Sequence, residues 1–213
     1  KGASFAIGTI RLPRMLAGLM AGFAFGIAGY TFQTMLRNPL ANPNVIGITT
    51  GSSAAAVFCI VVLQSSKAVT SLASVLAGLL TALVIYALSR GKSFSIGRLI
   101  LIGIGIQAMC NSMITYLMLI GEEHDLPAAV RWLTGSLNGV KMAELPVLVI
   151  SMIILVPLIC LLSRPLMMLE LGEQTAASLG VKTDLTSVLL MLSAVVLASI
   201  ATAIAGMFTF VGL

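Results

Sequence analysis

Six long apolar segments follow one another along the chain, and short polar connections separate them. Their approximate bounds are 15–35, 44–64, 69–89, 98–120, 145–162 and 185–208. A helix needs roughly 20 mostly apolar residues to cross the hydrocarbon core of a bilayer, and a helix satisfies its own backbone hydrogen bonds in lipid. The pattern therefore predicts an all-α, polytopic membrane protein with six visible spans.

The composition excludes a soluble globular domain. Of the 213 residues, 59% are hydrophobic and only 9% are charged, and the mean hydropathy is +1.11. Soluble domains carry about 25% charged residues. The formal net charge is +5, but the basic residues are scattered. We therefore expect the lipid bilayer as the surroundings and no nucleic-acid partner.

The first apolar segment has a regular series of glycines. Gly18, Gly22 and Gly26 recur every four residues, which places them on one face of a helix. Small residues at this spacing let membrane helices approach each other closely. We interpret this face as a packing surface.

The acidic residues lie outside all six predicted spans. There are seven of them, and they fall within or beside the connections at 121–144 and 163–184. Ion-coupled transporters usually place an ionisable group at membrane depth. The absence of acidic residues from the predicted spans therefore favours transport whose energy comes from another protein. Backbone carbonyls can also bind sodium, so an ion-coupled secondary transporter stays open as the alternative.

Catalytic and metal-binding motifs are missing from the sequence. His124 is the only histidine, and it lies in a polar connection. Metalloprotease, nucleophile-elbow and P-loop patterns do not occur, and the three cysteines lack the spacing of metal ligands. We expect no catalytic residues, no bound metal and no cofactor.

Two connections are long enough to hold structure of their own. Residues 121–144 are amphipathic and predict a short interfacial helix with Trp132 at the headgroup level. Residues 163–184 predict two short helices, the second over about 172–179, with Gly180 directly after it. The small apolar surface of that second helix fits either the lipid surface or a partner protein. Basic residues divide six against six between the two faces, so charge does not fix the orientation.

Several sequence motifs resemble one known family. They are Arg-Leu-Pro-Arg at 11–14, Gln33 with Arg-Asn-Pro-Leu-Ala-Asn-Pro at 37–43, Gly47 with Gly-Ser-Ser-Ala at 51–54, Leu-Gly-Glu at 171–173 with Ser-Leu-Gly-Val at 178–181, and the glycine-flanked stretch 206–213. In order and spacing they are similar to the FecCD permease family. Its members are the membrane subunits of ABC importers for iron–siderophores, haem and cobalamin.

The resemblance implies a fold and a setting. The family has the type II ABC importer fold, with about ten spans per subunit. Residues 1–213 are then one permease domain, truncated at both ends, running from the second span to the seventh. The implied location is the inner (cytoplasmic) membrane of a bacterium, where the protein is multi-pass. The implied partners are a second permease subunit, as a homodimer or a related pair, cytoplasmic ATPase subunits and an extracytoplasmic substrate-binding protein.

The resemblance also implies roles for individual residues. The connection 163–184 is the cytoplasmic coupling segment, and its contacts to the ATPase come from Glu170, Leu171, Gly172, Glu173, Ala176, Ser178, Leu179 and Gly180. Arg11 and Arg14 match positions that receive acidic residues of the binding protein. Snorkelling of these two arginines to lipid phosphates is the competing interpretation.

The segment 98–120 matches the span that lines the family's substrate path. Gln107, Asn111 and Thr115 lie four residues apart and share one helix face. They line the path or form hydrogen bonds to neighbouring helices, and the sequence does not separate these possibilities.

Three hypotheses follow. The first is a permease subunit of an ATP-driven importer for an iron–siderophore or a similar metal chelate, with ATP hydrolysis on another subunit, so that this chain is not an enzyme. The second is the secondary transporter. The third is a membrane scaffold without a transport path.

Overall fold

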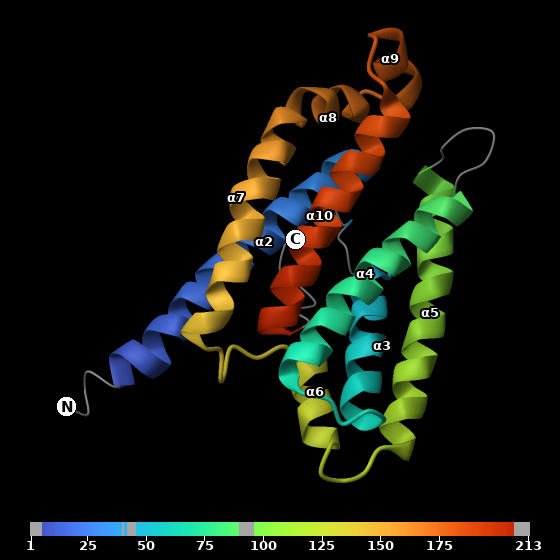
Figure 1. Ribbon diagram of the computed structural model, residues 1–213. Helices are drawn as coiled ribbons and strands as arrows, with labels where there is room; N and C mark the ends of the chain where they lie inside the picture. The colour runs from blue at the N-terminus through green and yellow to red at the C-terminus, as the bar shows by residue number, and fades with distance from the viewer. Residues whose placement is uncertain (1–5, 40, 42–45, 90–95, 207–213) are drawn as a thin grey trace.

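The computed structural model describes residues 6–39, 41, 46–89 and 96–206, and these residues form helices and connections without a strand. The helices are η1 (Ala6–Arg11), α2 (Leu12–Leu36), α3 (Ile48–Val61), α4 (Lys67–Ser89), α5 (Ile96–Ile120), α6 (Leu126–Thr134), η2 (Met142–Glu144), α7 (Leu145–Leu161), α8 (Ser163–Glu170), α9 (Glu173–Ser178) and α10 (Thr183–Ala205). The all-α fold class predicted from the sequence is confirmed. Figure 1 shows the bundle from the side, with α8 and α9 at one end and α6 at the other.

Five of the described helices are long and apolar enough to cross a membrane: η1 with α2, then α4, α5, α7 and α10. The apolar segment 44–64 differs from expectation, because α3 has only 14 residues. That length corresponds to about 21 Å, which is short of the roughly 30 Å hydrocarbon core. Two left-handed residues limit α3, since Gly47 has φ +82° and Gln64 has φ +45°.

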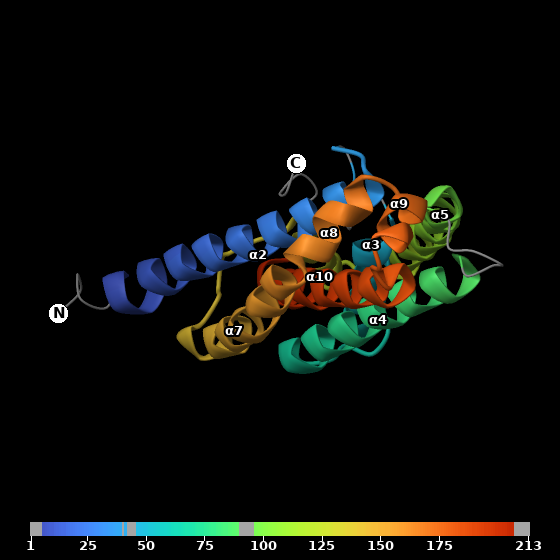
Figure 2. The ribbon, with the colours of Figure 1, turned by 90° about the horizontal axis from the view of Figure 1, so that it is seen from above.

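Helix α10 is the centre of the bundle. It packs against α2, α4 and α7, and α3 packs against α4 and α5. Viewed from above, α10 lies between α2 on one side and α4 and α7 on the other (Figure 2). Its buried residues are mostly alanine, serine and threonine. Such small side chains let helices approach closely in a membrane, where dispersion contacts replace the hydrophobic effect as the main attraction.

Glycines set the closest helix contacts. A Cβ atom added at Gly51 of α3 would lie 2.1 Å from Oγ1 and 2.8 Å from Cβ of Thr81 in α4. A Cβ atom at Gly78 of α4 would lie 2.2 Å from Oγ of Ser52 and 2.5 Å from Oγ of Ser199. Any larger residue at these two positions would push α3, α4 and α10 apart.

The glycine face of α2 is mostly open. A Cβ atom at Gly18 would meet the side chain of Leu137 at 3.0 Å, but a Cβ atom at Gly22 or Gly26 would have no neighbour within 4 Å among the described residues. The predicted packing surface therefore lacks a partner helix within the described part of the chain.

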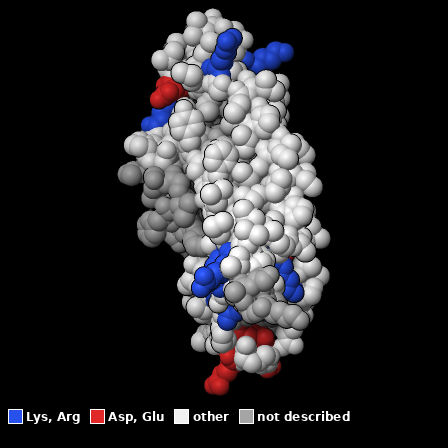
Figure 3. Space-filling model, turned by 90° about the vertical axis from the view of Figure 1, so that its left-hand side faces the viewer, with Lys and Arg blue, Asp and Glu red and all other residues white. Residues whose placement is uncertain are grey.

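Charged side chains gather toward the two ends of the molecule. In the space-filling view, Lys, Arg, Asp and Glu occupy both ends of the visible face, and an uncharged band separates them (Figure 3). This distribution is what a bilayer requires, because charges are costly in its hydrocarbon core. We call the two ends the α9 end and the α6 end.

Candidate coupling segment, translocation path and α6-end cavity

The connection between α7 and α10 folds into two short helices, as the sequence predicts. α8 begins at Ser163, directly after Leu162 caps α7. The chain then reverses at Gly172, whose φ of +114° is a conformation that residues with a side chain rarely adopt. α9 follows at the tip of the molecule (Figure 1).

The end of α9 is fixed by its own backbone. Gly180 is left-handed, with φ +86°, and its N–H donates to the carbonyl of Ala177 at 3.0 Å. The N–H of Val181 donates to the carbonyl of Ala176, also at 3.0 Å. These two bonds form a Schellman motif. The position of Gly180 after Leu179 was the sequence signal for this ending.

The α8–α9 segment has a buried side and an exposed apolar side. Leu166, Leu169 and Ala176 are buried in the main core. Leu171 and Leu179 are 66% and 57% exposed, and they lie beyond the ends of the spans. Glu170 and Ser178 are exposed as well. The α8–α9 segment is thus anchored to the bundle by its buried side chains, and its outer surface exposes Leu171 and Leu179.

Arg37 stands beside this segment, which the sequence did not predict. It caps α2 in a left-handed conformation, with φ +51°. Its Nη1 atom lies 3.6 Å from the position that a Cβ atom at Gly172 would take. Arg37 is the first residue of the motif at 37–43, which carries part of the family resemblance. The fold brings this residue close to the turn between α8 and α9.

Arg11 and Arg14 lie toward the opposite end. Both are exposed, and the helix that carries them begins earlier than the sequence suggested, because η1 continues into α2 without a break. Nη2 of Arg14 donates a hydrogen bond to Oδ1 of Asn138, which follows α6. The two cations therefore sit within a continuous helix, and one of them is oriented by a residue 124 positions away.

The three polar residues predicted for a substrate path do not share one environment. Gln107 is half-buried, and its Cβ and N atoms lie 3.1 Å from the position of a Cβ atom at Gly47. Asn111 and Thr115 are exposed, and the Thr115 hydroxyl donates to the carbonyl of Asn111 at 2.9 Å. α5 places these two polar groups on its open side, whereas it uses Gln107 to pack against the start of α3.

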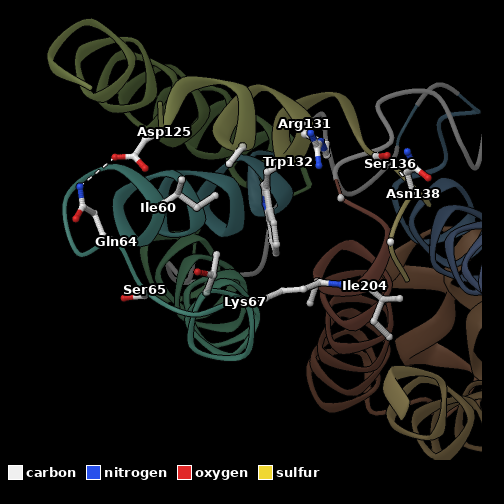
Figure 4. A pocket seen from close by; sticks show the side chains of 15 residues that line it. Ile60, Gln64, Ser65, Lys67, Asp125, Arg131, Trp132, Ser136, Asn138 and Ile204 are labelled. Carbon is white, nitrogen blue, oxygen red and sulfur yellow. Dashed lines mark hydrogen bonds between the residues drawn. The ribbon is translucent and has the colours of Figure 1, made fainter. Parts of the chain in front are cut away.

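A cavity of about 490 Å³ opens at the α6 end between α3, α6 and the end of α10. Figure 4 shows Trp132 directed into it, with Lys67 and Ile204 across from Trp132. Nε1 of Trp132 is buried and has no hydrogen-bond partner in the described structure. Trp132 thus lines a cavity at the α6 end, and its level relative to the headgroups stays a prediction. α6 itself packs on α3, which holds the ring in this position.

Two polar pairs fix the walls of this cavity. Nζ of Lys67 lies 2.8 Å from a carboxylate oxygen of Glu144, and this pair joins the start of α4 to the start of α7. Nε2 of Gln64 donates to Oδ2 of Asp125 at 3.2 Å, the bond drawn in Figure 4. His124 is an exposed neighbour of Asp125 and Glu122 at 3.4 Å. The described residues contain no group of three metal-ligating side chains.

The profile of the FecCD transport family matches residues 2–213. The chain belongs to the FecCD transport family. It is 36% identical over 203 residues to the ferric enterobactin transport system permease protein FepG of Escherichia coli K12, an alignment that covers 95% of this chain and 62% of FepG. It is 35% identical over 210 residues to the Fe(3+)-citrate import system permease protein YfmE of Bacillus subtilis 168, covering 98% of this chain and 63% of YfmE.

Other FecCD relatives import a different cargo. The vitamin B12 import system permease protein BtuC of Vibrio vulnificus is 32% identical over 206 residues, covering 96% of this chain and 62% of BtuC. The FecCD chain described here thus spans about 62% of the length of these relatives.

A solved structure supports the family at the level of the fold. A metal-chelate type ABC transporter in an inward-facing conformation matches with a TM-score of 0.89 and 30% identity, covering 98% of this chain and 67% of the other. PsaBC of Streptococcus pneumoniae matches with a TM-score of 0.61 and 16% identity, which shows a shared fold alone. The FecCD chain therefore shares its helix arrangement with a metal-chelate type ABC transporter.

Proposed function

We propose that this chain is part of a permease subunit of an ATP-driven importer that moves a metal chelate across the bacterial cytoplasmic membrane. The chelate class is an iron–siderophore, haem or cobalamin. The names of the relatives mention ferric enterobactin, Fe(3+)-citrate and vitamin B12. ATP hydrolysis belongs to a separate cytoplasmic subunit, and a second permease subunit completes the path. The observation that carries this proposal is the α8–α9 segment, with Leu171 and Leu179 exposed beyond the spans.

The chemistry of this segment fits a docking element. Exposed leucines at the end of a membrane bundle are unfavourable in water, so burial in a cleft of a partner is favourable by about 25 cal/mol per Å² of apolar surface. The buried Ala176 and the Schellman ending keep α9 rigid, so a push on its outer side is transmitted to α8 and α10. In this proposal the α9 end faces the cytoplasm.

The docking role is tested by replacing Leu171 and Leu179 and comparing the effect on uptake with that of replacing Leu185. Leu171→Ala and Leu179→Ala are introduced into the full-length importer with its ATPase and binding protein. We expect uptake to fall several-fold while the basal ATPase rate per complex is kept, because closure of the ATPase is no longer transmitted. Leu185→Ala is the matched control, because Leu185 is 55% exposed but lies in the first turn of α10. Normal coupling in both α9-end variants would overturn the assignment.

We place the substrate-binding protein at the α6 end, near Arg11 and Arg14. Both guanidinium groups are exposed there, and a charged rim suits acidic residues of a partner. Arg11→Glu is expected to weaken binding of the partner about tenfold or more, mainly through a slower association rate at low salt. Lys182→Glu, at the opposite end of the bundle, is the control. Equal affinities for the two variants would favour lipid snorkelling instead.

Ion coupling without an ATPase is the competing hypothesis. Each of the seven acidic residues lies in a connection, in a short helix at the bundle's ends or in the first turn of a span, as the described chain places them. This distribution offers no carboxylate at membrane depth for proton coupling. Uptake by the full-length permease alone, driven by an ion gradient without the ATPase, would support the secondary transporter and refute the importer.

A further inference from the structure

A continuous apolar groove runs along the side of the bundle formed by α4, α7 and α10. One part of it, about 590 Å³, lies between the starts of α4 and α7 and the end of α10. A second part, about 430 Å³, continues between α7 and α10. Both parts are lined by Val147 and Ile200, so they are successive stretches of one groove. Figure 2 shows that α4 and α7 flank α10 on the side away from α2.

The groove is charged at one end only. Lys67, Lys141 and Glu144 line its mouth at the α6 end. Lys67 is paired with Glu144 at 2.8 Å, whereas Lys141 is exposed and has no ion pair within the described residues. Two ammonium groups and one carboxylate leave a formal charge of +1 at the mouth. The rest of the groove, down to Leu155, is lined by apolar side chains together with Ser71 and Ser151. Both hydroxyls are already bonded within the protein, because Ser71 donates to the carbonyl of Ala203 and Ser151 donates to the carbonyl of Leu148.

The length of the groove matches one leaflet of a bilayer. From Glu144 to Leu155 the wall formed by α7 rises by 1.5 Å per residue, which gives about 16 Å. The hydrocarbon core of a bilayer is roughly 30 Å thick, so half of it is about 15 Å. An acyl chain that starts at the charged mouth would therefore end near the deep end of the groove.

We propose that this groove binds a membrane phospholipid with an anionic head group. Its phosphate lies at Lys141 and Lys67, and one acyl chain fills the groove between α7 and α10. The single negative charge of such a head group neutralises the charge at the mouth. The lipid belongs to the leaflet at the α6 end.

The groove wall fits lipid better than a further helix. Leu72 of α4 and Ile150 of α7 are 62% and 56% exposed on its flanks. Helix contacts in membranes favour small residues instead. The open face for a helix in this chain is the glycine face of α2, where Gly22 and Gly26 have no neighbour within 4 Å among the described residues.

Native mass spectrometry of the full-length importer tests this proposal. The complex is purified in detergent and given equal amounts of dioleoyl phosphatidylglycerol and dioleoyl phosphatidylcholine. We expect preferential retention of phosphatidylglycerol. Lys141→Gln should reduce that preference about fivefold, since one basic residue near anionic lipid contributes this much. Lys182→Gln, at the other end of the bundle, should leave the preference unchanged.

A second pair of variants tests the apolar part. Val147 is 57% exposed and borders both parts of the groove, so Val147→Trp should fill it and abolish retention of one lipid of either type. Val149→Trp places the same ring on another side of α7 and should retain that lipid. Equal lipid counts in the two tryptophan variants, together with an unchanged preference in Lys141→Gln, would overturn the proposal. That result would indicate that protein, either another segment of the full-length chain or a second copy, covers the groove.

Lipid retention does not depend on transport. A missing lipid would leave the proposed import function intact, and failed coupling would leave the groove occupied, so the two proposals fail separately.

Discussion

Helices α10 and α5 have similar lengths, 23 and 25 residues, yet they occupy opposite environments. In α10, 67% of the apolar stretch is buried inside the molecule, whereas the figure for α5 is 17%. α10 places alanine, serine and threonine in the core. α5 exposes Leu101, Met109 and Leu119, each by more than 70%. Apolar character therefore shows that a helix crosses the membrane, but the size of its side chains shows how deeply it lies in the bundle.

The difference has a simple physical origin. Lipid tails are as apolar as leucine, so a large apolar side chain gains little by leaving lipid for protein. Small side chains gain from the close backbone approach that they allow. A helix rich in small residues is thus drawn to the centre, and a helix rich in large ones stays at the edge until a partner subunit covers it.

The largest expected effect comes from enlarging a small residue in α10. Ala201→Leu adds three carbon atoms at a fully buried position and should destabilise the fold by about 3 kcal/mol. Ala108→Leu makes the same change at an exposed position of α5 and should have almost no effect. Thermal melting of the detergent-solubilised full-length protein measures both. Similar losses in the two variants would remove the distinction between the helices.

Two glycines of α5, Gly103 and Gly105, allow a crowded and an open position to be compared within one helix. A Cβ atom at Gly103 would lie 2.7 Å from the backbone carbonyl oxygen of Ile46, whereas one at Gly105 would have no neighbour within 4 Å in the described part of the chain. Gly103→Ala should cost about 2 kcal/mol. Gly105→Ala should stabilise the helix by up to about 1 kcal/mol, the usual gain from glycine to alanine. Melting curves that shift in the same direction would contradict this.

The open side of α5 is also the place to test the proposed substrate path. The Asn111 amide is exposed and makes no hydrogen bond within the described residues. Asn111→Leu should lower uptake up to about tenfold, the equivalent of one hydrogen bond, without changing the melting temperature. Ser112→Ala is the control, because the Ser112 hydroxyl already donates to the carbonyl of Ala108 at 2.9 Å. Unchanged uptake in Asn111→Leu would remove this residue from the path.

The smallest effect is expected at the edge of the bundle. Lys67 and Glu144 form an ion pair in which the lysine side chain is 51% exposed. Lys67→Gln should therefore cost only about 0.5 kcal/mol, and the loss should shrink as salt is added. Urea or thermal unfolding at low and high salt measures it. A loss as large as that of Ala201→Leu would show that charged contacts, rather than the small residues of α10, hold the bundle together.

Local features of the fold followed from the sequence alone. Apolar runs predicted the long helices because a bilayer demands continuous apolar length and internal hydrogen bonding. Gly180 predicted the ending of α9, since a left-handed residue after a helix is best supplied by glycine. The motifs at 11–14, 37–43 and 171–173 predicted the family, which the match over residues 2–213 confirmed.

Other features depended on the tertiary structure. The sequence treated 44–64 as a span, but backbone turns at Gly47 and Gln64 shorten α3. Helical spacing in the sequence places Gln107, Asn111 and Thr115 on one helix face. In the structure α3 packs against Gln107, whereas Asn111 and Thr115 stay exposed. Helical spacing assigns residues to a face, but it does not say which neighbour that face meets.

The sequence by itself therefore determined the secondary structure of this protein, its long apolar spans, the polar character of its two ends and its family. The tertiary structure decided which span lies at the centre, which face stays open, that Trp132 lines a cavity, and that Arg14 meets Asn138. Hydropathy and capping depend on residues that are neighbours within one continuous segment, so they can be read from the sequence. Burial and contact arise between segments that lie far apart in the chain, and only the packing of whole helices brings those segments together.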